Sequence, residues 1–87
     1  MNITKQTIAS KLLSYLQHKI QLGELVDWAE NAIMEGNLQS NETKILREAL
    51  GKIGVADVKT FGLTWDDCAA LMHKLGYKVK IEALLVA

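Results

Sequence analysis

Residues 23–35 read GELVDWAENAIME, and this stretch decides the fold class because its apolar positions recur with the period of an α-helix. The apolar side chains form one stripe, at Leu22, Leu25, Val26, Ala29, Ala32 and Ile33. The opposite face carries Glu24, Asp27, Glu30, Asn31 and Glu35, and Trp28 lies on the border between the two faces. We therefore predict an amphipathic helix that buries one face against other helices.

Two further segments show the same helical periodicity. Residues 5–18 follow Thr4, whose hydroxyl can cap the first turn of a helix. A third helix is expected to begin after Ser40 or Asn41 and to run to about Ile53. Residues 37–42, NLQSNE, are predicted to be a loop between the second and third helices because they are polar and lack periodicity.

The spacing of Thr64 and Asp67 predicts a fourth helix that runs to about Leu75. The pair is a variant of the capping box, with Asp in place of the usual Glu or Gln. Glycines follow three of the helical patterns, at Gly36, Gly54 and Gly76, and at each we expect the left-handed conformation that commonly ends a helix.

The last part of the chain predicts a β-strand. Residues 77–86 read YKVKIEALLV, in which apolar and charged residues alternate up to Ala83. The candidate strand comprises Tyr77, Lys78, Val79, Lys80, Ile81, Glu82, Ala83 and Leu84. Its backbone groups need partners. These are a short internal strand at residues 1–3 or 57–61, a second copy across a two-fold axis, or another protein, and we favour the homodimer.

The overall composition indicates one small globular domain of 87 residues. The expected fold is mainly α, formally α+β: a compact bundle of four helices followed by the C-terminal strand. Hydrophobic residues make up 49% and charged residues 23%, which argues against disorder. The chain shows neither a signal segment nor a long apolar run, so we expect a cytoplasmic protein without membrane contact.

Charge is distributed unevenly, although the formal net charge is zero. Residues 1–19 carry +3, residues 20–43 carry −5 and residues 44–87 carry +2. Overall neutrality counts against nucleic-acid binding, which usually requires a basic surplus. The acidic second helix indicates a docking surface for a basic protein, formed by Glu24, Asp27, Trp28, Glu30, Asn31 and Glu35. An ordinary solvated helix face is the alternative.

Residue types that carry chemistry occur without the spacing that chemistry requires. Cys68 lies within an apolar helix face, so we interpret it as a core thiol. His18 and His73 match no metal-binding pattern, and we expect neither metal nor cofactor. Trp65 is expected in the core, whereas Trp28 fits either the core or an interface. A DNA-reading fourth helix is disfavoured because aspartates lie at its start.

These observations predict a non-enzymatic protein-interaction module that is homodimeric. An immunity- or antitoxin-type inhibitor that masks a basic partner is the alternative within binding proteins. A small enzyme or metal-binding protein is the alternative from another class.

Overall fold

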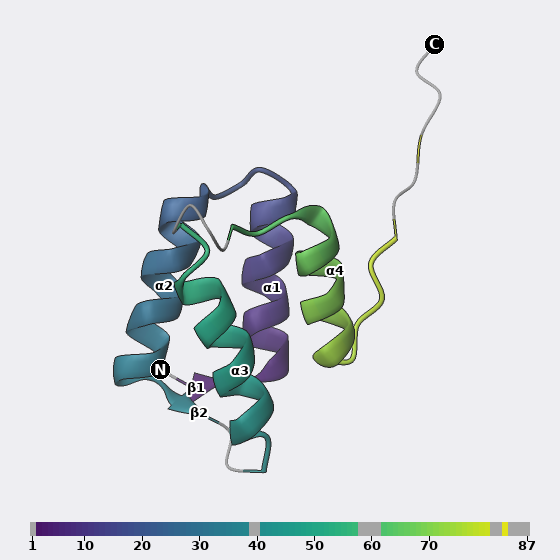
Figure 1. The fold of residues 1–87 in the computed structure, drawn as a ribbon. Helices are drawn as coiled ribbons and strands as arrows, with labels where there is room; N and C mark the ends of the chain where they lie inside the picture. Colours follow the sequence, from purple (N-terminus) through teal and green to yellow (C-terminus); the bar gives the residue numbers. More distant parts are fainter. Residues whose placement is uncertain (1, 39–40, 58–61, 81–82, 84–87) are drawn as a thin grey trace.

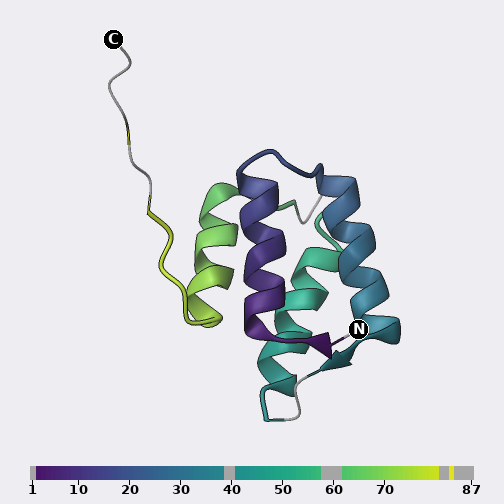
Figure 2. The same cartoon turned by 180° about the vertical axis from the view of Figure 1, so that it is seen from behind.

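The acidic amphipathic helix forms as predicted and packs most extensively against the third helix. The computed structural model describes residues 2–38, 41–57, 62–80 and 83. Within these residues α1 (Lys5–Leu16), α2 (Leu22–Glu35), α3 (Thr43–Gly54) and α4 (Trp65–Lys74) surround a common core (Figure 1). The opposite view shows α1 between α2 and α4, with its outer face uncovered (Figure 2). The predicted mainly helical bundle is therefore confirmed.

Side-chain caps begin two of the helices as the sequence predicts. The Thr7 N–H donates to Thr4 Oγ1 at 3.1 Å, and the Thr4 N–H donates to Thr7 Oγ1 at 3.2 Å. At α4 the Asp67 N–H donates to Thr64 Oγ1 at 3.1 Å, and the Thr64 N–H donates to Asp67 Oδ2 at 3.0 Å. Both reciprocal pairs satisfy backbone donors that lack helical partners.

The start of α3 differs from its prediction. The helix begins at Thr43, and its N-cap residue is Glu42 in place of Ser40 or Asn41. Ser40 lies outside the described residues. Asn41 and Glu42 turn the chain into the helix, and the Glu42 carboxylate lies 3.3 Å from Lys5 Nζ. This ion pair holds the entry of α3 against the start of α1.

Several helix ends differ from the prediction in position or in backbone conformation. The helix α1 ends at Leu16, and His18 takes the left-handed conformation with a φ of 60°. Gly76 is left-handed as expected, with a φ of 91°. Gly54 is instead the last residue of α3, and Gly36 is extended with a φ of −80°. A Cβ atom at Gly36 would lie 2.5 Å from the Ala32 carbonyl oxygen, so this glycine serves close packing.

A short parallel sheet replaces part of the predicted loop. The strand β1 (Asn2–Ile3) pairs with β2 (Asn37–Leu38), in the register Asn2 with Asn37 and Ile3 with Leu38. The prediction of a loop at residues 37–38 is therefore wrong. The extended backbone at Gly36 carries the chain past Ile3, which is fully buried, and the two strands pair beside it.

The predicted C-terminal strand is not shown. Residues 77–80 and Ala83 have no regular secondary structure in the single chain, and Ile81, Glu82 and Leu84 lie outside the described residues. One of the two internal mates, β1, pairs with β2. Residues 58–61, most of the other mate, also lie outside the described part. Pairing of residues 77–84 with a second copy therefore stays a prediction.

The core is built mainly from aliphatic side chains of all four helices. Its fully buried members include Ile3, Ile8, Leu12, Leu25, Leu46, Leu50, Ile53 and Cys68. The predicted burial of Trp65 and of Ile33 is wrong, because their side chains are 43% and 48% exposed. Ile33 follows Ala32, and one residue is a rotation of about 100°, which turns it away from the buried line. Trp65 is exposed for a different reason. It is the first residue of α4, and the buried residues of this helix begin only at Cys68.

Candidate interaction surfaces

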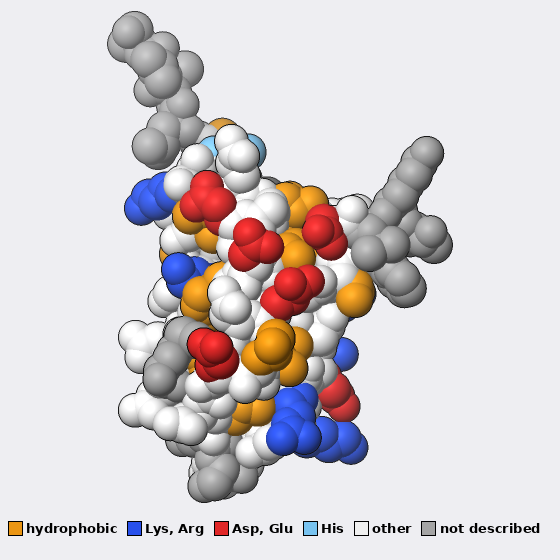
Figure 3. Space-filling model, turned by 90° about the vertical axis from the view of Figure 1, so that its left-hand side faces the viewer, with side chains coloured by type: hydrophobic (Ala, Val, Ile, Leu, Met, Phe, Trp, Pro, Cys, Tyr) orange, Lys and Arg blue, Asp and Glu red, His pale blue; other side chains and the backbone are white. Residues whose placement is uncertain are grey.

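The acidic residues of α2 form a continuous exposed face. Glu24, Asp27, Glu30, Asn31 and Glu35 are all exposed. Figure 3 looks onto the side of the molecule where α2 lies and shows acidic side chains separated by apolar ones. Ion pairs between described residues join Lys5 to Glu42 and Lys52 to Asp67, so neither uses an acid of α2. The structure thus brings the predicted acidic residues together.

This charge arrangement disfavours the helix. Glu24 and Asp27, and Asp27 and Glu30, are separated by three residues, and like charges at that spacing repel. Glu35 lies at the C-terminal end, where the helix dipole opposes a negative charge. Glu24 has the favourable position, since the Gln21 N–H donates to its Oε1 at 3.5 Å. Several of these acids therefore do not stabilise the helix, so helix stability alone does not explain why this face is acidic.

Trp28 belongs to the edge of this face that is nearer to α1. Its ring is half-buried and packs against the core cluster. Lys11 Nζ lies 5.6 Å from the ring centroid, a distance typical of a cation–π contact. Trp28 therefore joins α2 to α1, and only its remaining exposed part is available to a partner.

Two exposed apolar residues of α2 also belong to the acidic face, although the sequence pattern did not identify them as part of it. Met34 is 80% exposed and Ile33 is 48% exposed. A Cβ atom at Gly54 would lie 3.8 Å from Glu30 Cγ and 4.0 Å from Ile33 Cδ1, so these two side chains lie beside the end of α3. Met34 follows Asp27 by seven residues and Glu30 by four, which are helical positions of one face. That spacing was the available signal.

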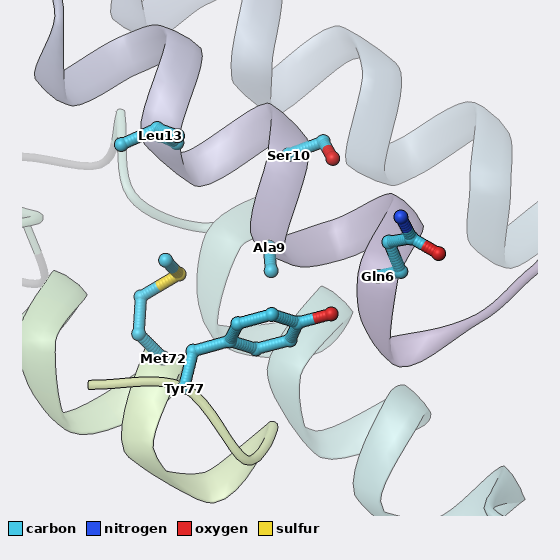
Figure 4. Close-up of a pocket in the computed structure, with 6 residues that line it drawn as sticks. All are labelled: Gln6, Ala9, Ser10, Leu13, Met72 and Tyr77. Carbon is cyan, nitrogen blue, oxygen red and sulfur yellow. The ribbon is translucent and has the colours of Figure 1, made fainter. Parts of the chain in front are cut away.

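A second surface lies between α1 and α4 and carries a shallow hollow of about 150 Å³. Its lining consists of Gln6, Ala9, Ser10, Leu13, Met72 and Tyr77 (Figure 4). The Tyr77 ring lies along Ala9, and Met72 extends toward Leu13. Tyr77, the first residue of the predicted dimer strand, therefore contributes to a surface that is otherwise formed by α1 and α4.

Cys68 has the properties of an unreactive core thiol. The side chain is fully buried. Burial raises the pKa of the Cys68 thiol to about 11, and the adjacent Asp67 carboxylate adds to the increase. The residue is therefore a protonated core thiol at neutral pH, in agreement with its position in an apolar helix pattern. Within the described part of the chain, His, Cys, Asp and Glu form no cluster of three that could hold a metal ion.

Comparisons with known proteins provide no relative from which a function could be inferred, so the functional proposal rests on the acidic face of α2 and the α1–α4 surface. No protein-family model, no curated protein and no solved structure matches this chain. None of the helices in the described residues has both the length and the apolar character needed to cross a membrane.

Proposed function

We propose that this protein is a non-enzymatic protein-interaction module and that the acidic face of α2 docks a basic partner protein. The acidic face is defined here as Glu24, Asp27, Glu30, Asn31 and Glu35, with Met34 and Ile33 among them. The observation that carries the proposal is the exposure of these carboxylates beside the exposed apolar side chains of Met34 and Ile33, and neither ion pair between described residues uses an acid of α2.

The carboxylates and the apolar side chains of the acidic face have different roles in binding. Exposed carboxylates attract a basic partner, speed its encounter and reject acidic competitors. Charge pairs that stay solvated add little free energy, so an apolar contact must supply much of the affinity. Met34 suits this role because its flexible side chain adapts to different apolar groups. A basic partner with an apolar stripe fits the face best.

An immunity- or antitoxin-type inhibitor is one form of this function. Such a protein would use the acidic face to cover the basic working surface of its target. The exposed apolar side chain of Met34 favours a lasting contact over a brief electrostatic encounter. Coexpression with a basic target would test this form by loss of the target's activity.

We further propose that the protein is a homodimer in which residues 77–84 pair with the same residues of a second copy. The alternation of apolar and charged residues from Tyr77 to Ala83 supports this arrangement. Val79 packs against the core cluster and Tyr77 against α1, whereas Lys78 and Lys80 are exposed. These contacts direct Tyr77 and Val79 toward the helices and leave Lys78 and Lys80 on the outer side, which is the alternation expected of a strand with one buried face.

Binding to a defined probe tests the acidic face. The probe is a labelled, Lys- and Leu-rich amphipathic helical peptide, and fluorescence anisotropy gives its dissociation constant. Changing Glu24→Gln, Asp27→Asn and Glu30→Gln together should weaken binding about tenfold or more at low salt. The matched control changes Glu48→Gln, Asp57→Asn and Asp66→Asn, three exposed acids outside α2.

The same variants serve in capture from the native cell. Partners of the acidic face should be recovered by the wild type and by the control variant and lost with the α2 variant. Equal peptide binding by all three proteins, together with identical recovered partners, would show that the acidic face is only solvated surface. Added salt should weaken the wild-type interaction and have little effect on what binding remains in the α2 variant.

A further inference from the structure

The surface formed by α1 and α4 differs from the acidic face of α2 because it combines exposed apolar side chains with uncharged polar ones, and charged residues such as Asp66 and Lys78 lie at its margin. Large exposed apolar residues in the described chain include Leu13, Trp65 and Tyr77, which are 43%, 43% and 39% exposed. Leu13 and Tyr77 line the hollow between the two helices. Isolated exposed apolar residues need no explanation, but a group of them marks an interaction site.

Trp65 extends this group along α4. Trp65, Ala69 and Met72 are separated by four and three residues, so they follow one line along the helix. Met72 lines the hollow, whereas Asp67 projects toward α3, where its carboxylate lies 3.6 Å from Lys52 Nζ. Trp65 is therefore on the α1 side of α4, and tryptophan and tyrosine are the side chains most enriched where binding energy concentrates.

The lysines of α1 are directed away from this surface. Lys5 is paired with Glu42 at the start of α3, and Lys11 covers the Trp28 ring on the α2 side. The uncovered face of α1 consists of uncharged side chains at Gln6, Ser10, Leu13 and Gln17. These residues follow spacings of four, three and four, so they lie on one face of the helix.

We propose that this uncharged surface, comprising Gln6, Ser10, Leu13, Trp65, Met72 and Tyr77, is where a second copy of this chain binds. The inference rests on the homodimer of the proposed function and adds a contact surface to it. In a two-fold interface each residue near the axis meets its own copy, so a charge there meets an identical charge. The α1–α4 surface satisfies this condition and the acidic face of α2 does not.

The small side chain of Ser10 favours close approach of two helices. Ser10 leaves room for the backbone of a neighbouring α1, while Leu13 and Trp65 supply apolar contact on either side. The hydroxyl and amide groups of Ser10 and Gln6 can hydrogen-bond to a copy without requiring a charged partner. Tyr77 is the first residue of the segment 77–84, so the proposed helix contact and the proposed strand meet at this residue.

Sedimentation equilibrium on the full chain tests the surface. Ser10→Glu places two carboxylates near the two-fold axis, and Leu13→Gln removes an apolar contact. Both residues are exposed, so the monomer should still fold. The double variant should raise the dimer dissociation constant at least tenfold. The matched control, Asn31→Glu on the exposed face of α2, should leave it unchanged.

Tryptophan fluorescence gives an independent measurement. In a Trp28→Phe variant Trp65 is the sole tryptophan, so its emission reports on the proposed surface alone. Emission should shift to shorter wavelength as rising protein concentration drives dimerisation and removes water from the ring. An emission spectrum that stays constant while sedimentation shows dimer formation would overturn the proposal.

A third variant separates this surface from strand pairing. Lys80→Pro removes a backbone N–H from residues 77–84 and leaves α1 and α4 intact. If Lys80→Pro abolishes the dimer while Ser10→Glu with Leu13→Gln does not, the homodimer stands and the α1–α4 surface is wrong. If the wild type remains monomeric at millimolar concentration, both the homodimer and this surface are wrong.

Discussion

Two neighbouring helices, α1 and α2, contribute to the same core and present opposite chemistry to their surroundings. Each buries an aliphatic stripe, with Ile8 and Leu12 from α1 and Leu25 and Ala29 from α2. The outer face of α2 is acidic with Met34 exposed near its C-terminal end, whereas that of α1 is uncharged with Leu13 exposed. Burial therefore explains why both segments are helices, but it does not explain how their outer faces differ. We attribute that difference to two partners: a basic protein at α2 and a second copy at α1.

The largest expected effect separates the core side of α1 from its outer side. Leu12 is fully buried and Leu13 is 43% exposed, although they are adjacent in sequence. Leu12→Ala should lower the free energy of unfolding by about 2–5 kcal/mol, because it removes buried methyl groups and leaves a cavity. Leu13→Ala should change it by about 0.5 kcal/mol or less. Urea unfolding monitored by circular dichroism measures both, and equal losses would contradict the assignment of Leu13 to an outer surface.

The next effect contrasts the two ends of α2. Gly36→Ala should destabilise the fold by about 1–3 kcal/mol, since its Cβ would be 2.5 Å from the Ala32 oxygen and 2.7 Å from Ile3 Cγ1. Gly23→Ala on the exposed start of the helix meets no atom within 4 Å. That change should stabilise by about 0.5–1 kcal/mol through helix propensity. Thermal denaturation should show shifts of opposite sign, and a shift of the same sign in both would disprove the close approach at Gly36.

A smaller effect distinguishes the start of α4 from the start of α2. Thr64→Ala removes the side-chain acceptor of the Asp67 N–H and should cost about 0.5–2 kcal/mol. Gln21→Ala at the start of α2 serves as the control, because glutamine is not among the residues preferred at an N-cap and the cost should be smaller. Equal losses in urea unfolding would show that the cap at Thr64 contributes little.

The cap of α4 also predicts a dependence on pH. The hydrogen bond from the Thr64 N–H, with help from the Thr64 hydroxyl and Lys52, lowers the pKa of Asp67 below its usual value of 3.8. A lowered carboxyl pKa stabilises the fold above that usual value, and the contribution disappears as pH falls through the lowered pKa. Asp67→Asn should therefore be less stable than the wild type at neutral pH, and the difference should shrink in acid. A difference independent of pH would contradict this cause.

The smallest effect concerns the ends of the acidic face. Glu35→Gln removes an acid from the C-terminal end of α2 and should stabilise the protein by about 0.3–1 kcal/mol. Glu24→Gln removes an acid from the first turn and should destabilise it by a similar amount. Unfolding at low and high salt would measure both changes, which should diminish as salt screens the dipole. Changes of the same sign would indicate that repulsion among the acids outweighs their positions along the helix.

The amino-acid sequence by itself determined the four helices, the caps at Thr4 and Thr64, the core thiol Cys68 and the acidic face of α2. Each depends on local spacing, and local spacing determines which side chains share a face of a helix. The class of the fold follows from the same periodicity.

Only the tertiary structure decided which helix surfaces stay uncovered and which short segments pair. The pairing of β1 with β2 depends on two pieces of chain separated by more than thirty residues. Trp65 and Ile33 are apolar, yet the neighbouring elements leave them 43% and 48% exposed, and Lys11 turns toward Trp28. Exposure is a property of how elements pack together, because a side chain at the margin of an apolar stripe is buried only if another element reaches it.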